Sequence, residues 1–478
     1  MADVVEPSHH HVTASEDRIP VFQKIIYSIG ALVNQMQAAA LTAMVLVLNL
    51  GLGMDPAKVG IIGTVPRLFD AFSDPLIGYT SDNTRTRYGR RRPFMFWGAI
   101  VSGFLFCLLF QLHKANGNTF NFWYFIVIQC FFVVAFSFYS IPLIALGFEM
   151  TPDYHERTRL QGWGNTLGQL AWLVSPWLFK FMYSNADKDL IHGVRVLAVI
   201  FGVFILAGGV LPAIFNKEYF THLPKPDKKS MRKVVKDFFG GCAVAFKNRP
   251  FVQLCIITFL IFNGFMLASA FTAYNIFFYD YGGDYGKGGD LLGWNGTASA
   301  LVSFLIIFPL ITKMATKLGK RNTLLITIPL SIAGYALKWW GYNQQHPYLL
   351  LFTAPLIAFS LGSLFTIVTS MLADVCDFDE LQTGTRREGI FGAIYWWMIK
   401  LGQAAASLAS GFLLNWTGFK ESLHGHQSPH ALLYMRLCDI GIPIVASLIA
   451  IYFILTFDIS EDKAYNIRRQ LEERRGKA

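Results

Sequence analysis

The segment RLFDAFSDPLIG, residues 67–78, places three charged side chains inside an otherwise apolar run. On a helix with about 100° between successive residues, Arg67, Asp70 and Asp74 lie on one stripe no wider than about 80°. An ionised carboxylate at the centre of a bilayer costs about 3 kcal/mol or more. The segment therefore predicts a membrane-spanning helix whose charged stripe faces a polar interior rather than lipid.

The rest of the chain has the composition of a membrane protein. Of its 478 residues, 53% are apolar or aromatic and 15% are charged, and the mean hydropathy is +0.40. Soluble domains carry roughly 25% charged residues. A water-soluble fold of this length needs more polar surface than the sequence supplies, which excludes a soluble enzyme, a disordered chain and a disulfide scaffold.

Apolar runs of about 20 residues are long enough to cross the hydrocarbon core of a bilayer. Twelve such runs are present, and each is predicted to be an α-helix, because a lipid-exposed span must satisfy its own backbone hydrogen bonds. The runs cover approximately residues 25–50, 57–80, 93–113, 121–149, 160–183, 192–215, 251–279, 291–312, 323–342, 348–374, 388–416 and 430–458. The predicted fold class is an all-α membrane protein with twelve transmembrane helices.

Lysine and arginine are distributed unevenly between the loops. If the amino terminus is cytoplasmic, the cytoplasmic segments contain 30 of the 41 basic residues, and this bias sets the orientation of membrane proteins. We therefore predict a multi-pass protein of the plasma (inner) membrane with both termini cytoplasmic. The net charge of +10 is explained by these anchors, which face anionic membrane lipids, so no nucleic-acid partner is expected.

The longest loop, at about residues 216–250, is basic and divides the spans into two groups of six. Two short echoes support a duplicated six-helix unit: RYGRR at 87–91 recurs as KLGKR at 317–321, and LGQ at 167–169 recurs at 401–403. The predicted domains are a cytoplasmic N-tail (1–24), an N-terminal half (25–215), a basic linker (216–250), a C-terminal half (251–458) and a cytoplasmic C-tail (459–478). This plan resembles the major facilitator fold, in which substrate binds between the halves near the membrane midplane.

Two carboxylates one helical turn apart repel each other inside a membrane and require a cation between them. The functional hypothesis is a coupling-cation site in which Asp70 and Asp74 bind Na⁺ or H⁺, aided by the hydroxyl of Ser73. The amine of Lys400, in the eleventh span, can neutralise the pair while the cation is absent. The structural alternatives are a fixed bridge between Arg67 and Asp70, and a purely structural pairing of Lys400.

A longer pattern surrounds the charged stripe. The run Asp70-x-x-x-Asp74-Pro75-x-x-Gly78-x-x-x-Asp82, continued by TRTRYGRRRP at 84–93, closely resembles the glycoside-pentoside-hexuronide:cation symporters, the melibiose permease-like family of the major facilitator superfamily. Further segments are similar to other parts of that family: LADVCD at 372–377, REG at 387–389, KLG at 400–402 and KNRPF at 247–251. The resemblance covers nearly the whole chain.

The resemblance implies roles for single residues. Asp70 and Asp74 are expected to bind the coupling cation, as a metal site if that cation is Na⁺, with Ser73 and Ser137 as hydroxyl ligands and Lys400 completing the site. No other cofactor is implied. The substrate is expected to be a small molecule held between the halves.

The positions expected to hold the substrate differ from those of melibiose permease. There, acidic residues of the first and fourth spans and a basic residue of the fifth hold the sugar, whereas the corresponding positions here are Gln35, Ser140 and Asn165. This argues against a galactoside in particular, although amides and hydroxyls still suit another glycoside. Further pocket candidates, whose rings can stack on sugars and whose polar tips can form hydrogen bonds, are Tyr27, Asn34, Tyr139, Trp163, Tyr395 and Trp396.

Opposite charges cluster in the cytoplasmic loops. Such loop charges are usually solvated and contribute little, but in a rocking carrier they can bridge the halves when the inner gate is shut. The predicted gating residues are Asp82, Arg85, Arg90, Asp153, Arg157, Asp377 and Arg386, with Arg87, Glu156, Arg159, Asp379, Glu380 and Arg387 beside them.

No motif of an enzyme is present in the sequence: we find no Walker loop, no HExxH and no nucleophile elbow. We predict a monomeric secondary symporter that imports a small polar solute, a sugar or glycoside, with Na⁺ or H⁺. One alternative is a cation-coupled carrier of lysolipids or other amphiphiles, with which the loss of the sugar-binding acids is compatible. An alternative of another class is a membrane sensor or scaffold that binds a ligand without transporting it.

Overall fold

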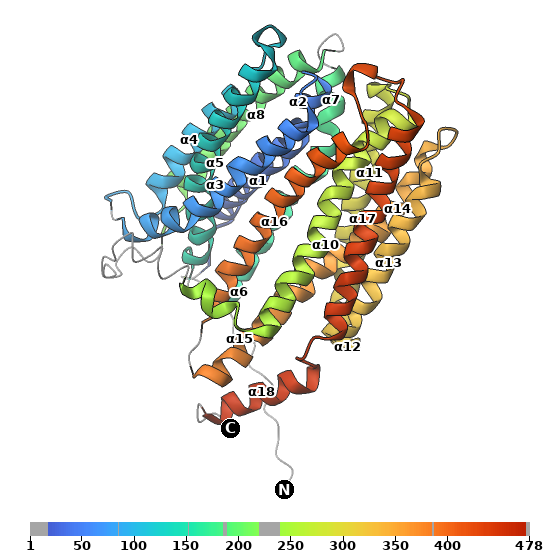
Figure 1. The fold of residues 1–478 in the computed structure, drawn as a ribbon. Coiled ribbons are helices and arrows are strands. Elements are labelled where there is room, and N and C mark those ends of the chain that lie inside the picture. Colours follow the sequence, from blue (N-terminus) through green and yellow to red (C-terminus); the bar gives the residue numbers. More distant parts are fainter. Residues whose placement is uncertain are drawn as a thin grey trace.

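The computed structural model describes residues 18–84, 86–151, 153–184, 189–218, 240–384 and 387–474. Within them the chain forms twelve membrane-length helical segments and no β-strand, in agreement with the predicted fold class. The first six segments are α1 (Val21–Met44) with α2 (Leu46–Leu50), α3 (Pro56–Asn83), α4 (Arg92–Leu109), α5 (Gly117–Glu149), α6 (Tyr154–Val174) with α7 (Leu178–Ser184), and α8 (Leu190–Phe215). They form the N half, on the left of Figure 1.

The second six segments form the C half, on the right of Figure 1. Three of them contain a π-helical stretch, at Asn275–Asp280, Ser303–Ile307 and Leu364–Val368. The helices are α10 (Arg249–Tyr274), α11 (Tyr285–Val302) with α12 (Phe308–Leu318), α13 (Lys320–Gly341), α14 (Thr353–Ser363) with α15 (Thr369–Thr383), α16 (Glu388–Trp416) and α17 (Pro429–Leu455). The predicted C-tail contains a further helix, α18 (Glu461–Arg474), which lies across the end of the bundle that carries both termini.

Hydropathy separates the spans into two kinds. Among the described residues, eight helical segments are long and apolar enough to cross a membrane on composition alone. The other four contain α3, α6 with α7, α13 and α16. Because α3 and α16 carry the predicted cation-site charges, their lower hydropathy reflects the polar interior that they face.

Local sequence explains where several spans begin. A side-chain cap followed by proline starts α3, where the Asp55 carboxylate accepts a hydrogen bond from the Ala57 amide at 2.9 Å, and Pro56 is the first helical residue. Ser428 caps α17 in the same way, accepting from the Ala431 amide at 3.1 Å. Both caps satisfy an amide that the helix itself leaves unpaired, and proline at the first position loses no hydrogen bond.

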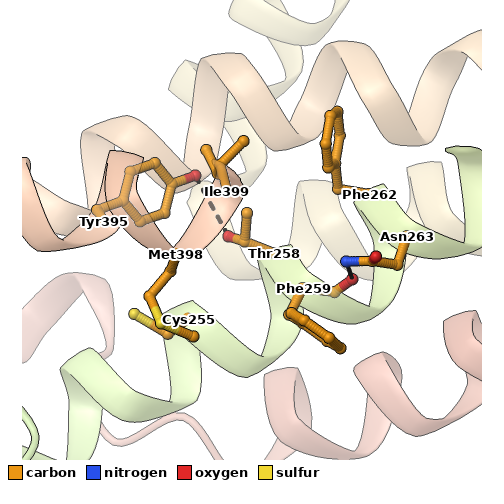
Figure 2. A pocket seen from close by; sticks show the side chains of 8 residues that line it. All are labelled: Cys255, Thr258, Phe259, Phe262, Asn263, Tyr395, Met398 and Ile399. Carbon is orange, nitrogen blue, oxygen red and sulfur yellow. Dashed lines mark hydrogen bonds between the residues drawn. The ribbon is translucent and has the colours of Figure 1, made fainter. Parts of the chain in front are cut away.

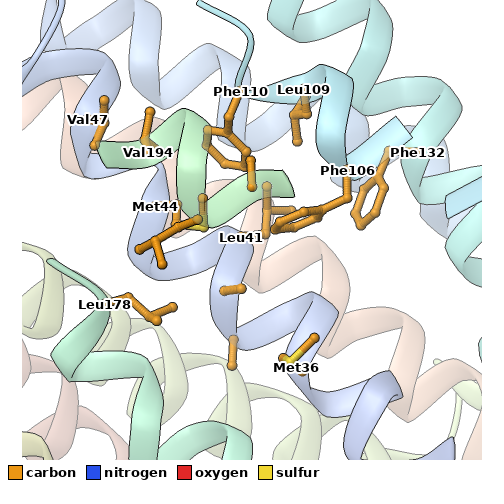
Figure 3. Packing of buried hydrophobic residues seen from close by; sticks show 14 of the residues in the cluster. Met36, Leu41, Met44, Val47, Phe106, Leu109, Phe110, Phe132, Leu178 and Val194 are labelled. Carbon is orange, nitrogen blue, oxygen red and sulfur yellow. The ribbon is translucent and has the colours of Figure 1, made fainter. Parts of the chain in front are cut away.

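Side chains pack closely inside each half. In the C half, α10 and α16 face each other, and Figure 2 shows Tyr395 and Met398 of α16 beside residues of α10. In the N half, Figure 3 shows α1 and α2 packed through Met36, Leu41, Met44 and Val47 against side chains of the other helices. These are Phe106 and Leu109 of α4, Phe110 directly after it, Phe132 of α5, Leu178 of α7 and Val194 of α8. A Cβ at Gly98 would lie 2.7 Å from the amide nitrogen of Tyr139, so glycine is required where α4 crosses α5.

The two halves are joined at the end of the bundle away from the termini. There Tyr274 of α10 donates a hydrogen bond to Asn49 of α2 at 3.0 Å, and Trp177 donates to Thr297 of α11 at 2.8 Å. Lys180 of α7 pairs with Asp290 of α11 at 2.7 Å. One buried apolar cluster also includes residues of both halves at this end. We call this set of contacts the outer closure.

Candidate functional site

The predicted charged stripe of α3 lies against α5 and α16. Small residues bring α3 and α16 together, since a Cβ at Gly60 would lie 2.7 Å from the Ser407 carbonyl oxygen. The Thr64 hydroxyl also donates a hydrogen bond to the Ala404 carbonyl across the two helices at 2.9 Å. One helical turn further along α16, this close approach places Lys400 opposite the stripe.

Four side chains from the three helices form one cluster. The amine of Lys400 binds Asp70 Oδ2 at 2.9 Å and also contacts Asp74 Oδ2. On the other side, the Ser137 hydroxyl lies 2.8 Å from Asp70 Oδ1 and 2.7 Å from Asp74 Oδ1. We call Asp70, Asp74, Ser137 and Lys400 the acid-pair site. The side chain of Asp70 is 4% exposed, whereas those of Asp74 and Lys400 are 25% and 30% exposed, so one face of the site is accessible.

The hydrogen-bond inventory of the site shows what it is able to bind. A serine hydroxyl carries one proton, yet Ser137 is within hydrogen-bond distance of an oxygen on each carboxylate. The hydroxyl can donate its proton to one carboxylate oxygen only. The oxygen of the other carboxylate then faces the serine oxygen with no hydrogen between them. A proton on that carboxyl group, or a cation between the oxygens, resolves the contact. The arrangement can therefore hold a proton or a small hard cation.

The structure also describes Ser73 and Arg67, the two other residues considered with the charged stripe. The hydroxyl of Ser73 donates to the backbone carbonyl of Asp70 at 3.2 Å, so it is turned toward its own helix and not toward the carboxylates. Among the described residues, the ion-pair partner of Asp70 is Lys400, and the alternative of a fixed bridge to Arg67 is not formed. The guanidinium of Arg67 is nonetheless near enough to interact electrostatically with both acids.

The predicted substrate tyrosines are all buried in this structure. Tyr27, Tyr139 and Tyr395 are at most 3% exposed and form part of the packed interior. The rings of Tyr27 and Tyr139 fill space between helices that glycines bring close together. Tyr27 packs beside Gly164, and the hydroxyl of Tyr139 donates to the Gly30 carbonyl at 3.0 Å. Close helix packing uses Tyr27 and Tyr139, whereas Tyr395 lines a small recess beside α10. A role of the three tyrosines in substrate binding stays a prediction.

The remaining substrate candidates are more accessible. The Gln35 carbonyl accepts a hydrogen bond from the Trp172 indole at 3.1 Å, which joins α1 to α6. Ser140 and Asn34 are partly buried, and Asn165 is exposed, while the Asn34 carbonyl oxygen has no hydrogen-bond partner among the described residues. Trp163 and Trp396 are 43% and 53% exposed, and Trp396 stacks on Phe365.

Of the residues that line a small recess in the C half, sequence reasoning singled out Tyr395 and missed the others. The recess lies between α10 and α16, is too narrow to hold a water molecule, and adjoins Lys400 in the chain through Ile399. Its polar groups are Thr258, whose hydroxyl donates to the Tyr395 oxygen at 3.2 Å, and Asn263, whose amide donates to the Phe259 carbonyl at 2.8 Å. Figure 2 shows both groups among apolar neighbours. The sequence feature that could have indicated this recess is the presence of isolated polar residues, Thr258 and Asn263, in an apolar run.

The described gate residues bind within one half each. Arg90 forms an ion pair with Glu149, and Arg91 pairs with the same carboxylate at 3.0 Å. Glu218, which the sequence did not single out, accepts hydrogen bonds from the backbone amides of three consecutive arginines, Arg90 to Arg92. Glu218 lies directly after the sixth span, and this position is the sequence feature that could have identified it.

For two of the other predicted gate residues, the contacts given below lie within one half. Asp153 caps α6 by accepting from the Glu156 amide at 2.7 Å, and Arg157 donates to the Thr151 carbonyl at 3.2 Å. Arg387 pairs with Asp379 at 2.7 Å inside the C half. Asp377 has further interactions. Arg85, Arg386 and the side chain of Asp82 lie outside the described residues.

Twelve membrane helices in two halves, with an acid-pair site where the halves meet, define a multi-pass membrane transporter of the major facilitator fold. The family model described as MFS/sugar transport protein matches residues 26–461. The chain therefore belongs to this family, and the predicted resemblance to the glycoside-pentoside-hexuronide:cation symporters is confirmed.

Known proteins similar to the chain have related names. The isoprimeverose transporter of Lactiplantibacillus pentosus is 25% identical over 421 residues, which cover 84% of this chain and 81% of that protein. The glucuronide carrier protein homolog of Escherichia coli (strain K12) is also 25% identical, covering 88% and 89%. A solved bacterial homolog of the human lysosomal transporter Spinster superposes with a TM-score of 0.65 at 13% identity, covering 94% of this chain and 100% of that chain, and shows the same fold.

Proposed function

We propose that this protein is a secondary active symporter that imports a small polar solute, a sugar or glycoside, together with Na⁺ or H⁺. The observation that carries the proposal is the acid-pair site, in which one amine from the C half bridges two carboxylates of the N half. Family membership supports the same function, since the relatives compared above are a transporter and a carrier of sugars. We propose that the protein acts as a monomer.

Coupling follows from the place that Lys400 occupies. Its amine lies where a coupling cation would bind, between Asp70 and Asp74. A Na⁺ ion or a proton that enters the pair offsets one of the two negative charges, which weakens the attraction of the carboxylates for the Lys400 amine and favours its release. Because this exchange changes a contact between the halves, the cation has different affinities for the two states of the carrier, and this difference drives transport.

The basic loops support a cytoplasmic location of the termini and insertion in the plasma membrane. With that orientation, the outer closure seals the external end, and the acid-pair site is reached from the cytoplasm. We propose that the gate forms in the opposite state, when the cytoplasmic ends of the halves meet. Its proposed members are Asp82, Arg85, Arg90, Asp153, Arg157, Asp377 and Arg386.

The site also supports an uncharged solute. Arg67 and Lys400 balance Asp70 and Asp74 in the cation-free state, so these four side chains do not by themselves favour a charged solute. Recognition then depends on amides, hydroxyls and ring faces. Gln35 with Trp172, and Asn34 with its unused carbonyl oxygen, provide such groups in the N half.

The proposal is tested by uptake of labelled sugars into proteoliposomes, with and without a Na⁺ gradient and with and without a pH gradient. Asp70→Asn and Asp74→Asn are each expected to abolish gradient-driven accumulation while leaving solute exchange measurable, because a neutral amide does not exchange a cation for the Lys400 amine. The matched control is Asp189→Asn, an exposed cap of α8 that asparagine replaces well. Normal cation-driven accumulation in both site variants would refute the proposal.

A further inference from the structure

A second buried group of charges lies in the C half, apart from the acid-pair site. The amine of Lys338, on α13, binds Asp439 of α17 at 2.7 Å, and the two side chains are 5% and 0% exposed. The hydroxyl of Tyr342 donates to the other oxygen of the same carboxylate. We call Lys338, Asp439 and Tyr342 the anchor cluster.

The anchor cluster binds the outer end of α10. The Lys338 amine donates to the Thr272 hydroxyl at 2.6 Å, and that hydroxyl lies 3.2 Å from Asp439 Oδ1. The Asn275 amide donates to Asp439 Oδ2 at 3.3 Å. Asn275 begins the π-helical stretch that ends α10, and such stretches mark places where a helix departs from regular geometry.

The outer end of α10 also contacts the N half and forms part of the outer closure. Tyr274 donates to Asn49 at 3.0 Å, and the ring of Phe277 lies 4.4 Å from that of Phe179 on α7, measured between centroids. Residues 272–278 therefore contact the anchor cluster through Thr272 and Asn275 and the N half through Tyr274 and Phe277. This short segment therefore links the anchor cluster of the C half to the N half.

Stability alone is a poor reason for such a cluster. Taking two charges out of water costs several kcal/mol per ion, and apolar replacements of a buried ion pair are often neutral or stabilising. The cluster instead fixes the position of α10. The amine and the phenol hold the carboxylate in one place, so its hydrogen bonds with α10 form at one position.

We infer that the anchor cluster positions the outer end of α10, so that this segment holds the outer closure and moves with the C half when the carrier opens outward. The inference rests on the proposed alternating access, and it assigns Lys338, Asp439 and Tyr342 as positioning residues of the external gate. Cutting the link between the cluster and α10 weakens the outer closure, even when the ion pair itself remains.

The test measures the separation of the halves directly and needs no substrate. Spin labels are placed on cysteines introduced at Lys114 and Lys287, exposed positions at the outer ends of the N and C halves, in a chain whose six native cysteines are replaced. The purified protein is studied in lipid nanodiscs. In Thr272→Val with Asn275→Leu, the ratio of the long-distance, outward-open population to the closed one is expected to rise about tenfold, through loss of hydrogen bonds to charged groups.

Two further variants keep the inference falsifiable. Tyr342→Phe removes one hydrogen bond to Asp439 and preserves the apolar contacts, so a smaller shift in the same direction is expected even if the double variant does not fold. Thr327→Val removes a buried hydroxyl that accepts from Ser363 within the C half, away from α10, and is expected to leave the distances unchanged.

The outcomes separate this inference from the proposed function. Distances equal to those of the unmodified protein in Tyr342→Phe and in the folded double variant would overturn the inference, and so would an equal shift in Thr327→Val. If the distances shift but no solute is transported, the positioning role is supported and the proposed function fails. If uptake is measured but the distances do not shift, the proposed function stands and the positioning role fails.

Discussion

The hydroxyl of Ser137 is expected to contribute to cation affinity at the acid-pair site. It lies within 2.8 Å of both carboxylates and is the one neutral group in the cluster. Ser137→Ala is expected to weaken the apparent affinity for the coupling cation about tenfold, the ratio that corresponds to about 1.4 kcal/mol. The measurement is solute uptake at increasing cation concentration.

Ser73 provides the matched control for that variant. Its hydroxyl belongs to the same turn of α3 but donates to the backbone carbonyl of Asp70. Ser73→Ala is therefore expected to leave the cation affinity unchanged. Equal losses in the two variants would show that Ser137 has no direct role at the cation.

Lys400 competes with the cation for the same oxygens. Lys400→Met removes that competitor, so the free protein is expected to bind the cation about tenfold more tightly, while gradient-driven accumulation is lost because the cation no longer displaces anything. Cation-dependent changes in melting temperature of the purified protein measure the first effect, and uptake measures the second. Lys320→Met, which removes the partner of Asp374 on another face of the C half, is the control.

Single residues differ in how far their sequence predicted their place. Asp70, Asp74 and Lys400 were predictable because a charge inside an apolar span is too costly to be left without a partner. The burial of Tyr27 and Tyr139 was not, since a buried ring is equally suited to a pocket and to a helix interface. For Tyr139, the contacts of its ring with Gly209 and of its hydroxyl with Gly30 distinguish the two.

At the scale of elements, the approach of α3 to α16 sets the geometry of the site. Gly60→Ala would place a Cβ 2.7 Å from the Ser407 carbonyl, so the two helices must separate. The expected cost is about 1–3 kcal/mol of stability, together with slower uptake because the Lys400 contact lengthens. Thermal unfolding and uptake rates measure these effects.

Gly78→Ala tests whether crowding is the cause. It lies on the same helix, but its added Cβ would find its nearest neighbour at 3.8 Å, an ordinary contact. This variant is expected to retain stability and uptake. A loss as large as that of Gly60→Ala would mean that helix flexibility, rather than the close approach, explains both.

Elements differ in predictability for a similar reason. Apolar runs of about 20 residues predict spans well, yet the π-helical stretches interrupt three spans of the C half and have no signature in hydropathy. Helix α18 was predicted only as a charged tail. Its docking depends on two apolar side chains, Ile467 and Leu471, which are buried at 4% and 5% exposure while the other faces remain charged.

At the scale of the whole molecule, transport requires that the outer closure be weak enough to break. The pair Lys180–Asp290 joins the halves at 2.7 Å, but its side chains are 30% and 37% exposed, so solvent screens it. Exposed pairs of this kind contribute about 0.2–1 kcal/mol. Lys180→Gln is therefore expected to raise the ratio of outward-open to closed protein by no more than about fivefold.

Reversing both charges separates the effect of the pair from that of its individual side chains. Lys180→Asp with Asp290→Lys restores an attraction across the same contact, so the distances between spin labels on the two halves are expected to return toward those of the unmodified protein. Each reversed side chain alone places like charges together and is expected to open the external end further than Lys180→Gln does. If the double reversal stays as open as the single ones, the ion pair does not contribute to the closure. The other contacts between the halves, those of α10 with the N half and the Trp177–Thr297 hydrogen bond, must then supply it.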